Sequence, residues 1–308
     1  MAGGRNLMSK AYCALAMAAA IAACTPEENV SNAAPDPVAA ANVEAPPPLL
    51  ESWVPWNEPQ APFRIAGDLY YVGAKNVSAY AVKTPDGIIL IDTGFAQTLP
   101  QIEANLKTLG MDIADVKIIL NSHAHADHAS GIAALKAKTG AQLVASEADA
   151  ALMAAGGRGD FTWGDDLAYP RVQADRIIGD RQTVELGGTT LTAQLTPGHT
   201  KGCTTWTMRA GDADVVFLCG TSAPGYDLVD NAAYPAIAED YARSFDRMAS
   251  LPCDIALAGH IEMTGLAEKA EKNAFIDPAG CRKTIADART AFEKELARQR
   301  AGGAPQRM

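Results

Sequence analysis

The most informative stretch of the sequence is Asn121-Ser122-His123-Ala124-His125-Ala126-Asp127-His128. It places three imidazoles and one carboxylate within six residues, and both groups are ligands that Zn²⁺ takes in proteins. Four such groups exceed what one tetrahedral ion accepts from so short a loop, so we predict two ions. An apolar run, 116–120, precedes the stretch and 131–136 follows it. We therefore expect a loop between a buried strand and a helix, where folds commonly carry chemistry.

The remaining histidines support a metal site. The chain has only five histidines, and the two outside the stretch, His199 and His260, each follow a glycine near the end of an apolar, β-rich run. A single histidine is more often a core or surface residue than a ligand. Because three of the five histidines are clustered, we expect them to be metal ligands.

Composition is that of an ordinary globular chain. The 308 residues are 48% hydrophobic and 20% charged, and the net charge is −10. Nucleic-acid-binding surfaces are basic, so this charge argues against a nucleic-acid partner.

The N-terminus resembles an export signal. Arg5 and Lys10 precede an apolar stretch, 11–23, which is too short to span a bilayer and typical of a signal peptide. The run Ile21-Ala22-Ala23-Cys24 resembles a bacterial lipobox, which predicts cleavage after residue 23, lipidation of Cys24 and a periplasmic, membrane-anchored protein. The alternative is an ordinary cleavage site with an incidental cysteine.

Residues 24–50 are rich in proline and alanine and have almost no aromatic or β-branched side chains, so we predict a disordered linker. The folded domain is expected at 51–308, without a transmembrane segment. Its pattern alternates short strands and helices. The expected strands are 69–72, 79–82, 87–91, 116–120, 142–145, 175–178, 189–195, 203–209 and 214–218, and the expected helices are 97–109, 131–139, 146–155, 236–250 and 281–297. This order predicts an α/β, four-layer αββα sandwich with both sheets inside.

The motifs resemble the metallo-β-lactamase superfamily. They are the His-x-His-x-Asp-His run, Leu90-Ile91-Asp92-Thr93-Gly94, Thr196-Pro197-Gly198-His199-Thr200 and Gly259-His260. Four further stretches are similar to the class B, subclass 3 zinc β-lactamases: 56–59, 156–161, 196–206 and 222–226. This resemblance implies an αββα fold, zinc as the cofactor and a small-molecule β-lactam as the substrate.

Residue by residue, the resemblance assigns His123, His125 and His199 to a first zinc. It assigns Asp127, His128 and His260 to a second. Two zinc ions close together would hold a bridging water as hydroxide near neutral pH, which would attack the lactam carbonyl. Asp127 would also orient this nucleophile, and we expect Asp92 to anchor the metal loop through hydrogen bonds.

The sequence just after the expected strand 214–218 differs from that of other superfamily members. Glyoxalase-like and lactonase-like members carry a Gly-Asp there, whereas this chain has Cys219-Gly220. The departure favours a β-lactamase. Subclass 1 enzymes use a cysteine in this region as a ligand, but Cys219 is one residue out of place, so we expect a buried free thiol.

Four cysteines remain after Cys13 and Cys24. The resemblance implies a disulfide between Cys253 and Cys281, and Cys203 and Cys219 are expected to be free buried thiols. It also places Ser222 where it would donate a hydrogen bond to the substrate carboxylate. The alternative is that Ser222 caps the turn before Pro224.

Three functions remain in view. The first is zinc-dependent hydrolysis of β-lactam antibiotics, which would confer resistance. The second is a lactonase or glyoxalase-like thioesterase of the same fold. The third is a non-enzymatic zinc protein, which is disfavoured because three ligands per ion leave open positions, unlike a closed structural site.

Overall fold

The computed structural model describes residues 43–306. The predicted signal peptide and the lipidation residue Cys24 lie outside these residues, as does most of the predicted linker. The described residues form one compact unit. No helix in 43–306 is long and apolar enough to cross a membrane.

Residues 43–50, expected to be linker, form neither helix nor strand, and part of this segment contacts the domain. The side-chain amide of Gln97 donates a hydrogen bond of 2.8 Å to the Pro47 carbonyl. A short 3-10 helix, η2 (Glu51–Asn57), follows and packs Trp53 against Phe95.

The first sheet has seven strands in sequence order. They are β1 (Phe63–Ala66), β2 (Leu69–Tyr71), β3 (Tyr80–Thr84), β4 (Gly87–Ile91), β5 (Val116–Leu120), β6 (Gln142–Ala145) and β7 (Arg176–Ile177). From β4 onward the pairing is parallel. The crossovers between these strands contain α1 (Leu99–Thr108), η4 (Ile113–Asp115), α2 (Ala126–Ala129), α3 (Ile132–Thr139) and α4 (Glu147–Ala154).

The second sheet has five strands in the order β12-β11-β10-β9-β8. They are β8 (Thr183–Leu186), β9 (Thr189–Leu195), β10 (Thr204–Ala210), β11 (Ala213–Leu218) and β12 (Ile255–Ala258). The helices of this half are α5 (Ile237–Ser250), η5 (Ile261–Thr264), α6 (Leu266–Glu271) and α7 (Pro278–Arg300). Within this second sheet, β11 and β12 are the one parallel pair, and α5 lies in the crossover that joins them.

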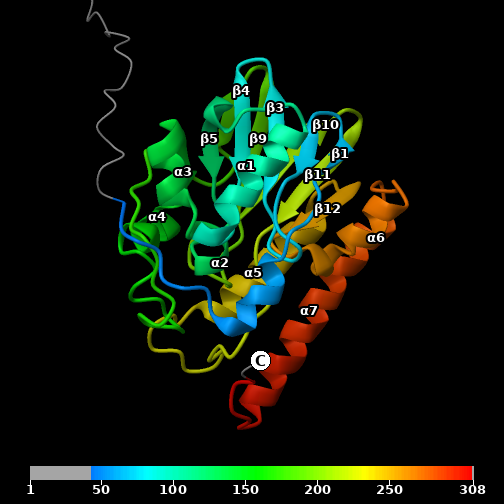
Figure 1. Cartoon of the computed structure of the whole chain (residues 1–308). Helices are drawn as coiled ribbons and strands as arrows, with labels where there is room; N and C mark the ends of the chain where they lie inside the picture. The colour runs from blue at the N-terminus through cyan, green and yellow to red at the C-terminus, as the bar shows by residue number, and fades with distance from the viewer. Residues whose placement is uncertain (1–42, 307–308) are drawn as a thin grey trace, which may run out of the picture. The chain divides into compact units, whose positions relative to one another are not determined.

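The strands alternate between two hydrophobic layers, as a period of two requires. On β4, Ile89 and Ile91 belong to the core between the sheets, whereas Ile88 and Leu90 pack with α1 and α3 on the outer face. On β11, Val215 and Phe217 face the inter-sheet core, and the alternate residues pack with α5 and α7. The fold is therefore the predicted four-layer αββα sandwich (Figure 1).

The predicted elements are present, mostly within two residues of their expected ends. The last helix begins three residues earlier than expected and ends three residues later, because Pro278 occupies its first turn and the Asp277 carboxylate accepts a hydrogen bond from the Gly280 amide. Two edge strands, β1 and β8, were not predicted, and β12 was expected only as the β-rich run before His260. β1 and β8 each have a single buried residue, so neither shows a clear alternation.

The cysteine prediction is half right. Cys253 and Cys281 are bonded as expected, joining the segment before β12 to α7. The prediction that Cys203 and Cys219 are free thiols is wrong, because they form a second disulfide. Their strands, β10 and β11, are antiparallel neighbours, and each cysteine lies just outside its strand at the same end of the pair, so the two residues face each other.

Candidate metal centre

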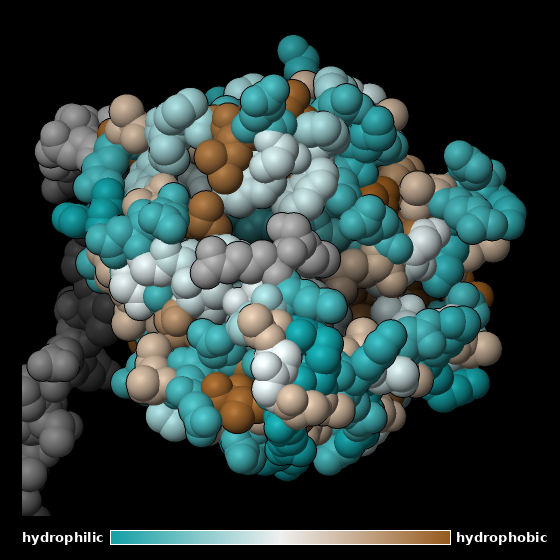
Figure 2. Space-filling model, turned by 90° about the horizontal axis from the view of Figure 1, so that it is seen from below, coloured by the Kyte–Doolittle hydropathy of each residue, from teal (hydrophilic) through white to brown (hydrophobic). Residues whose placement is uncertain are grey.

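The predicted ligands gather at one edge of the two sheets, beyond the carboxyl ends of β5, β9 and β12. His123 and His125 lie in the loop after β5, and Asp127 and His128 lie on α2. From the second sheet, His199 follows β9 and His260 follows β12. Hydrophilic side chains predominate when the molecule is viewed from below, with hydrophobic residues scattered between them (Figure 2).

The first predicted trio converges. His123, His125 and His199 each offer one ligand atom, and these atoms lie within 4.8 Å of one another. All three side chains are buried. His125 Nδ1 lies 3.2 Å from His199 Nε2, so these two nitrogens face the same point. Three converging imidazole nitrogens are a donor set that fits Zn²⁺.

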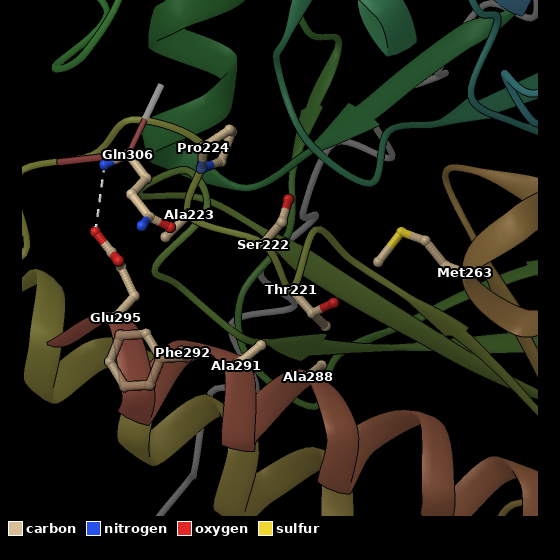
Figure 3. A pocket seen from close by; sticks show the side chains of 10 residues that line it. All are labelled: Thr221, Ser222, Ala223, Pro224, Met263, Ala288, Ala291, Phe292, Glu295 and Gln306. Carbon is tan, nitrogen blue, oxygen red and sulfur yellow. Dashed lines mark hydrogen bonds between the residues drawn. The ribbon is translucent and has the colours of Figure 1, made fainter. Parts of the chain in front are cut away.

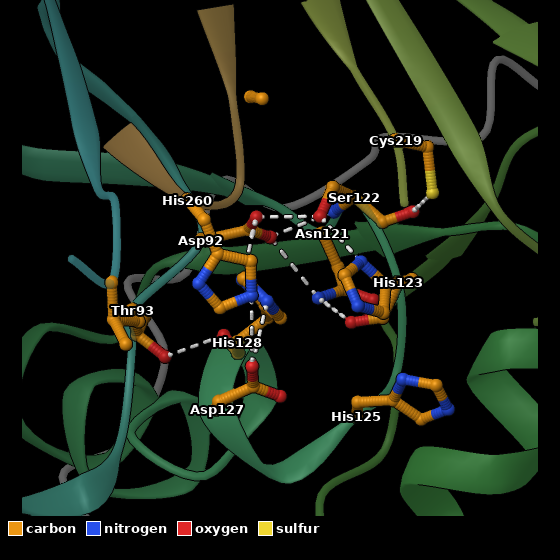
Figure 4. Close-up of polar contacts among 12 residues, drawn as sticks. Asp92, Thr93, Asn121, Ser122, His123, His125, Asp127, His128, Cys219 and His260 are labelled. Carbon is orange, nitrogen blue, oxygen red and sulfur yellow. Dashed lines mark hydrogen bonds and ion pairs between the residues drawn. The ribbon is translucent and has the colours of Figure 1, made fainter. Parts of the chain in front are cut away.

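The second predicted trio lies beside the first. Asp127 Oδ2 is 3.1 Å from His128 Nε2 and 3.3 Å from His260 Nε2 (Figure 4). Asp127 and His128 also form a candidate metal group with His123, which could therefore serve either position. Both ring nitrogens of His128 are buried without a well-formed hydrogen bond. Buried polar atoms in proteins are normally satisfied, so these nitrogens fit a role as metal ligands.

The charge states of two histidines at the first position suit metal binding. Burial, together with the neighbouring imidazoles, lowers the pKa of His123 well below its usual value and that of His199 to about 3. Both rings are thus neutral at physiological pH, and a neutral imidazole is the form that ligates metal. Burial opposes ionisation of Asp127, but His128 and His260 outweigh it and hold its pKa well below the usual range.

Asp92 anchors the metal loop, as predicted. Its carboxylate accepts hydrogen bonds from the Ser122 amide at 2.7 Å, the Ser122 hydroxyl at 2.5 Å and the Asn121 side chain at 3.2 Å (Figure 4). Asp92 Oδ2 also lies 3.6 Å from His128 Nδ1. The residue has a φ of 57°, a left-handed conformation that aspartate tolerates better than most residues.

Two further carboxylates support the centre, and neither was singled out from the sequence. Buried Asp149 on α4 accepts hydrogen bonds from the Ala124 amide at 3.1 Å, the Thr200 hydroxyl at 2.9 Å and the Gly202 amide at 3.1 Å. It therefore joins the two ligand loops, and burial raises its pKa to about 6. In the sequence it looks like an ordinary acid in the first turn of a helix.

Asp160 is the second of these carboxylates. It lies in the glycine-rich loop after α4, and its Oδ2 is 3.5 Å from His125 Nε2. The sequence stretch 156–161 carried a family resemblance, but no feature of it identified the contact with His125. Only the fold places this loop beside the histidines.

The loop after β11 positions His199. The His199 Nδ1–H donates to the Ser222 carbonyl at 2.7 Å, which leaves Nε2 unprotonated for a metal. The Tyr241 hydroxyl donates to the same carbonyl at 2.5 Å. The exposed Ser222 side chain lines a cavity of about 320 Å³ between this loop and α7 (Figure 3). Its hydroxyl makes no hydrogen bond to another residue within 43–306.

A model of the metallo-β-lactamase superfamily matches residues 72–260, more than half of the chain and all six predicted ligands. The chain belongs to this superfamily. Within it, three similar solved structures are metallo-β-lactamases. One from Cronobacter sakazakii is 46% identical and covers 80% of this chain and 98% of its own, with a TM-score of 0.77. FEZ-1 from Legionella gormanii is 41% identical, covers 80% and 99%, and has a TM-score of 0.78. BJP-1 from Bradyrhizobium japonicum, a subclass B3 enzyme, is 37% identical, covers 82% and 99%, and has a TM-score of 0.76. The predicted resemblance to subclass 3 is confirmed.

Matches among curated proteins are weaker. A probable metallo-hydrolase from Burkholderia pseudomallei is 32% identical over 37% of this chain, and a hydroxyacylglutathione hydrolase from Acidiphilium cryptum is 29% identical over 61%. The matches span 37% and 64% of the length of these relatives. They agree with a metal-dependent hydrolase of this superfamily.

Neither residue after β11 is a carboxylate. Cys219 is bonded to Cys203 and so offers no thiolate to a metal. Gly220 lies against the His199 ring, and a Cβ at this position would come within 2.1 Å of His199 Cδ2. The absence of a side chain at Gly220 is therefore a condition for the His199 ring to occupy its place.

Replacing Gly220 with alanine should displace His199 and weaken zinc binding at the first position by about 10- to 100-fold. Zinc titration with a competing chelator measures this, and metal analysis gives the stoichiometry. Gly179→Ala is the matched control, because its Cβ would approach only the flexible Gln182 side chain, at 3.3 Å. Unchanged zinc affinity in Gly220→Ala would show that the ring is not held by this contact.

Proposed function

We propose that the chain is a zinc-dependent β-lactamase that hydrolyses the amide bond of β-lactam antibiotics and binds two zinc ions. The observation that carries this proposal is the similarity to solved metallo-β-lactamases, which reaches 46% identity over 98% of the matched chain. The curated hydroxyacylglutathione hydrolase is less similar, at 29% identity over a shorter part. The lack of a carboxylate at Cys219-Gly220 supports the same choice.

The geometry supports six side chains as the metal ligands. His123, His125 and His199 fit the first position, and Asp127, His128 and His260 fit the second. Zinc bound there would polarise the lactam carbonyl and make an attacking water acidic enough to act near neutral pH. The two hydrogen-bonded supports, Asp92 and the Ser222 carbonyl, keep His128 and His199 oriented for this role.

Side chains of the protein orient the attacking water and bind the substrate. The Asp127 carboxylate, held ionised by its two imidazole neighbours, accepts a hydrogen bond from the attacking water and orients it. The Ser222 hydroxyl donates a hydrogen bond to the carboxylate that most β-lactams carry beside the ring nitrogen. Trp56 lies edge-on to His260, with ring centroids 5.2 Å apart, and packs against this ligand of the second position.

Purified protein with added zinc should hydrolyse at least one penicillin, cephalosporin or carbapenem much faster than a simple lactone or a glutathione thioester. The reason is that neither Cys219 nor Gly220 supplies a carboxylate, and that the chain is more similar to the solved β-lactamases than to the hydroxyacylglutathione hydrolase. Absorbance assays of each substrate measure the rates. Activity should disappear with a chelator and return with zinc. Fast thioester or lactone hydrolysis with no β-lactam hydrolysis would reject the assignment in favour of that second function.

Replacing Ser222 with alanine should lower kcat/KM for carboxylate-bearing β-lactams by about 10- to 150-fold, which corresponds to about 1.5 to 3 kcal/mol for a hydrogen bond to a charged group. Zinc content should stay unchanged, since only the backbone of Ser222 contacts His199. Ser250→Ala, an exposed serine on α5, is the control. If the two variants behave alike, Ser222 does not bind the substrate carboxylate.

We also propose that the chain is exported to the periplasm and lipidated at Cys24, on the strength of the signal-like N-terminus. Metabolic labelling with a lipid precursor should mark the wild-type protein, and Cys24→Ala should be unlabelled and released from membranes. A Cys24→Ala protein that still sediments with membranes would contradict anchoring through this residue.

A further inference from the structure

Asp160 divides its two carboxylate oxygens between two partners. Oδ1 accepts hydrogen bonds from the backbone amides of Thr162 and Trp163, both at 2.8 Å, and so fixes the turn of the loop. Oδ2 is buried and has no hydrogen bond among the described residues. It lies 3.5 Å from His125 Nε2, which is likewise buried without a hydrogen bond.

The opposite nitrogen of His125 faces the predicted metal position. His125 Nδ1 is 3.2 Å from His199 Nε2, and His199 Nε2 is unprotonated because the Nδ1 of that ring donates to the Ser222 carbonyl. His125 can therefore serve as a ligand only through Nδ1, which must then carry a lone pair. In a neutral imidazole the proton has to be on Nε2, the nitrogen that faces Asp160.

We propose that Asp160 is a positioning residue that sets the tautomer and ring orientation of His125, so that Nδ1 is presented to the first metal. A carboxylate facing Nε2 favours a proton on that nitrogen. The separation of 3.5 Å exceeds an ideal hydrogen bond, and a small rotation of the ring is enough to shorten it. The inference rests on metal binding at this centre and does not depend on the substrate being a β-lactam.

The loop of Asp160 also supports the other side of the centre. Phe161 packs edge-on to Tyr226 with ring centroids 5.1 Å apart, and the Tyr226 hydroxyl donates to the His199 carbonyl at 3.0 Å. One loop thus contacts His125 directly and His199 through an aromatic side chain. A role in loop shape and a role in tautomer selection must therefore be separated by experiment.

Asp160→Asn separates them. The amide oxygen has to replace Oδ1 as acceptor for Thr162 and Trp163, so the amide NH₂ would face His125 Nε2. Two donors cannot face each other, and the ring would move its proton to Nδ1, the ligand nitrogen. If Asp160 sets the tautomer, this variant should bind the first zinc about 10- to 100-fold more weakly while keeping the thermal stability of the metal-free wild type.

Zinc titration with a chromophoric chelator gives the affinity of the full chain, and circular dichroism gives the melting temperature. Asp160→Ala loses both backbone hydrogen bonds, so a role in loop shape alone predicts a damaged alanine variant and a normal asparagine variant. Asp165→Asn is the control, because Asp165 supports the same loop by accepting from the Gly159 amide at 2.9 Å. The proposal is overturned if Asp160→Asn binds zinc as tightly as wild type.

A measurement on the wild type keeps the test decisive if Asp160→Asn does not fold. Long-range ¹H–¹⁵N NMR spectra of the zinc-loaded protein distinguish the two imidazole tautomers. We expect a proton on His125 Nε2 and a metal-bound Nδ1. A proton on Nδ1 instead, or a wild type that binds no zinc, would overturn the proposal.

Discussion

The metal centre depends on the packing of two sheets face to face, because its ligands come from both. Hydrogen bonds cross this interface directly beneath the metal loop: the Trp206 indole of β10 donates to the Asn121 carbonyl at 3.0 Å, and the Thr204 amide donates to the Ser122 carbonyl at 2.8 Å. On the other side, the Tyr80 hydroxyl of β3 donates to the Ala258 carbonyl at 2.7 Å, two residues before His260. The apolar inter-sheet core therefore supplies the energy that holds polar ligands together.

The buried polar groups of the ligand loops are tolerated because a small number of carboxylates accept hydrogen bonds from them. Asp92 holds the first half of the metal loop, and Asp149 ties its middle to the loop of His199. A buried carboxylate loses its hydrogen bonds to water, and several hydrogen bonds from the protein replace them. Each of these residues also stiffens a loop at a strand end that carries metal-ligand candidates.

Much of the fold and all six proposed ligands could be predicted from the sequence, for identifiable reasons. The ligands are close in sequence or follow β-rich runs, and the unbroken apolar run from Ile88 to Ile91 marks a strand buried on both faces. The supporting residues could not be found in this way. Asp160 reaches His125 across a separation of 35 residues in sequence, set only by the path of a glycine-rich loop. The pairing of Cys203 with Cys219 was missed because it depends on the antiparallel register of β10 and β11, which two isolated cysteines in a sequence do not reveal.

That second disulfide affects which metals the centre can accept. Cys219 Sγ lies 3.2 Å from the Ser122 carbonyl, immediately beneath the metal loop. In the reduced chain two thiols would stand there, and thiolates are the soft ligands that attract copper(I) and other thiophilic ions. Bonding the two sulfurs to each other removes both from competition and leaves a donor set of imidazole nitrogen and carboxylate oxygen. With this disulfide formed, thiophilic ions would find none of the thiolate ligands they prefer at the metal loop.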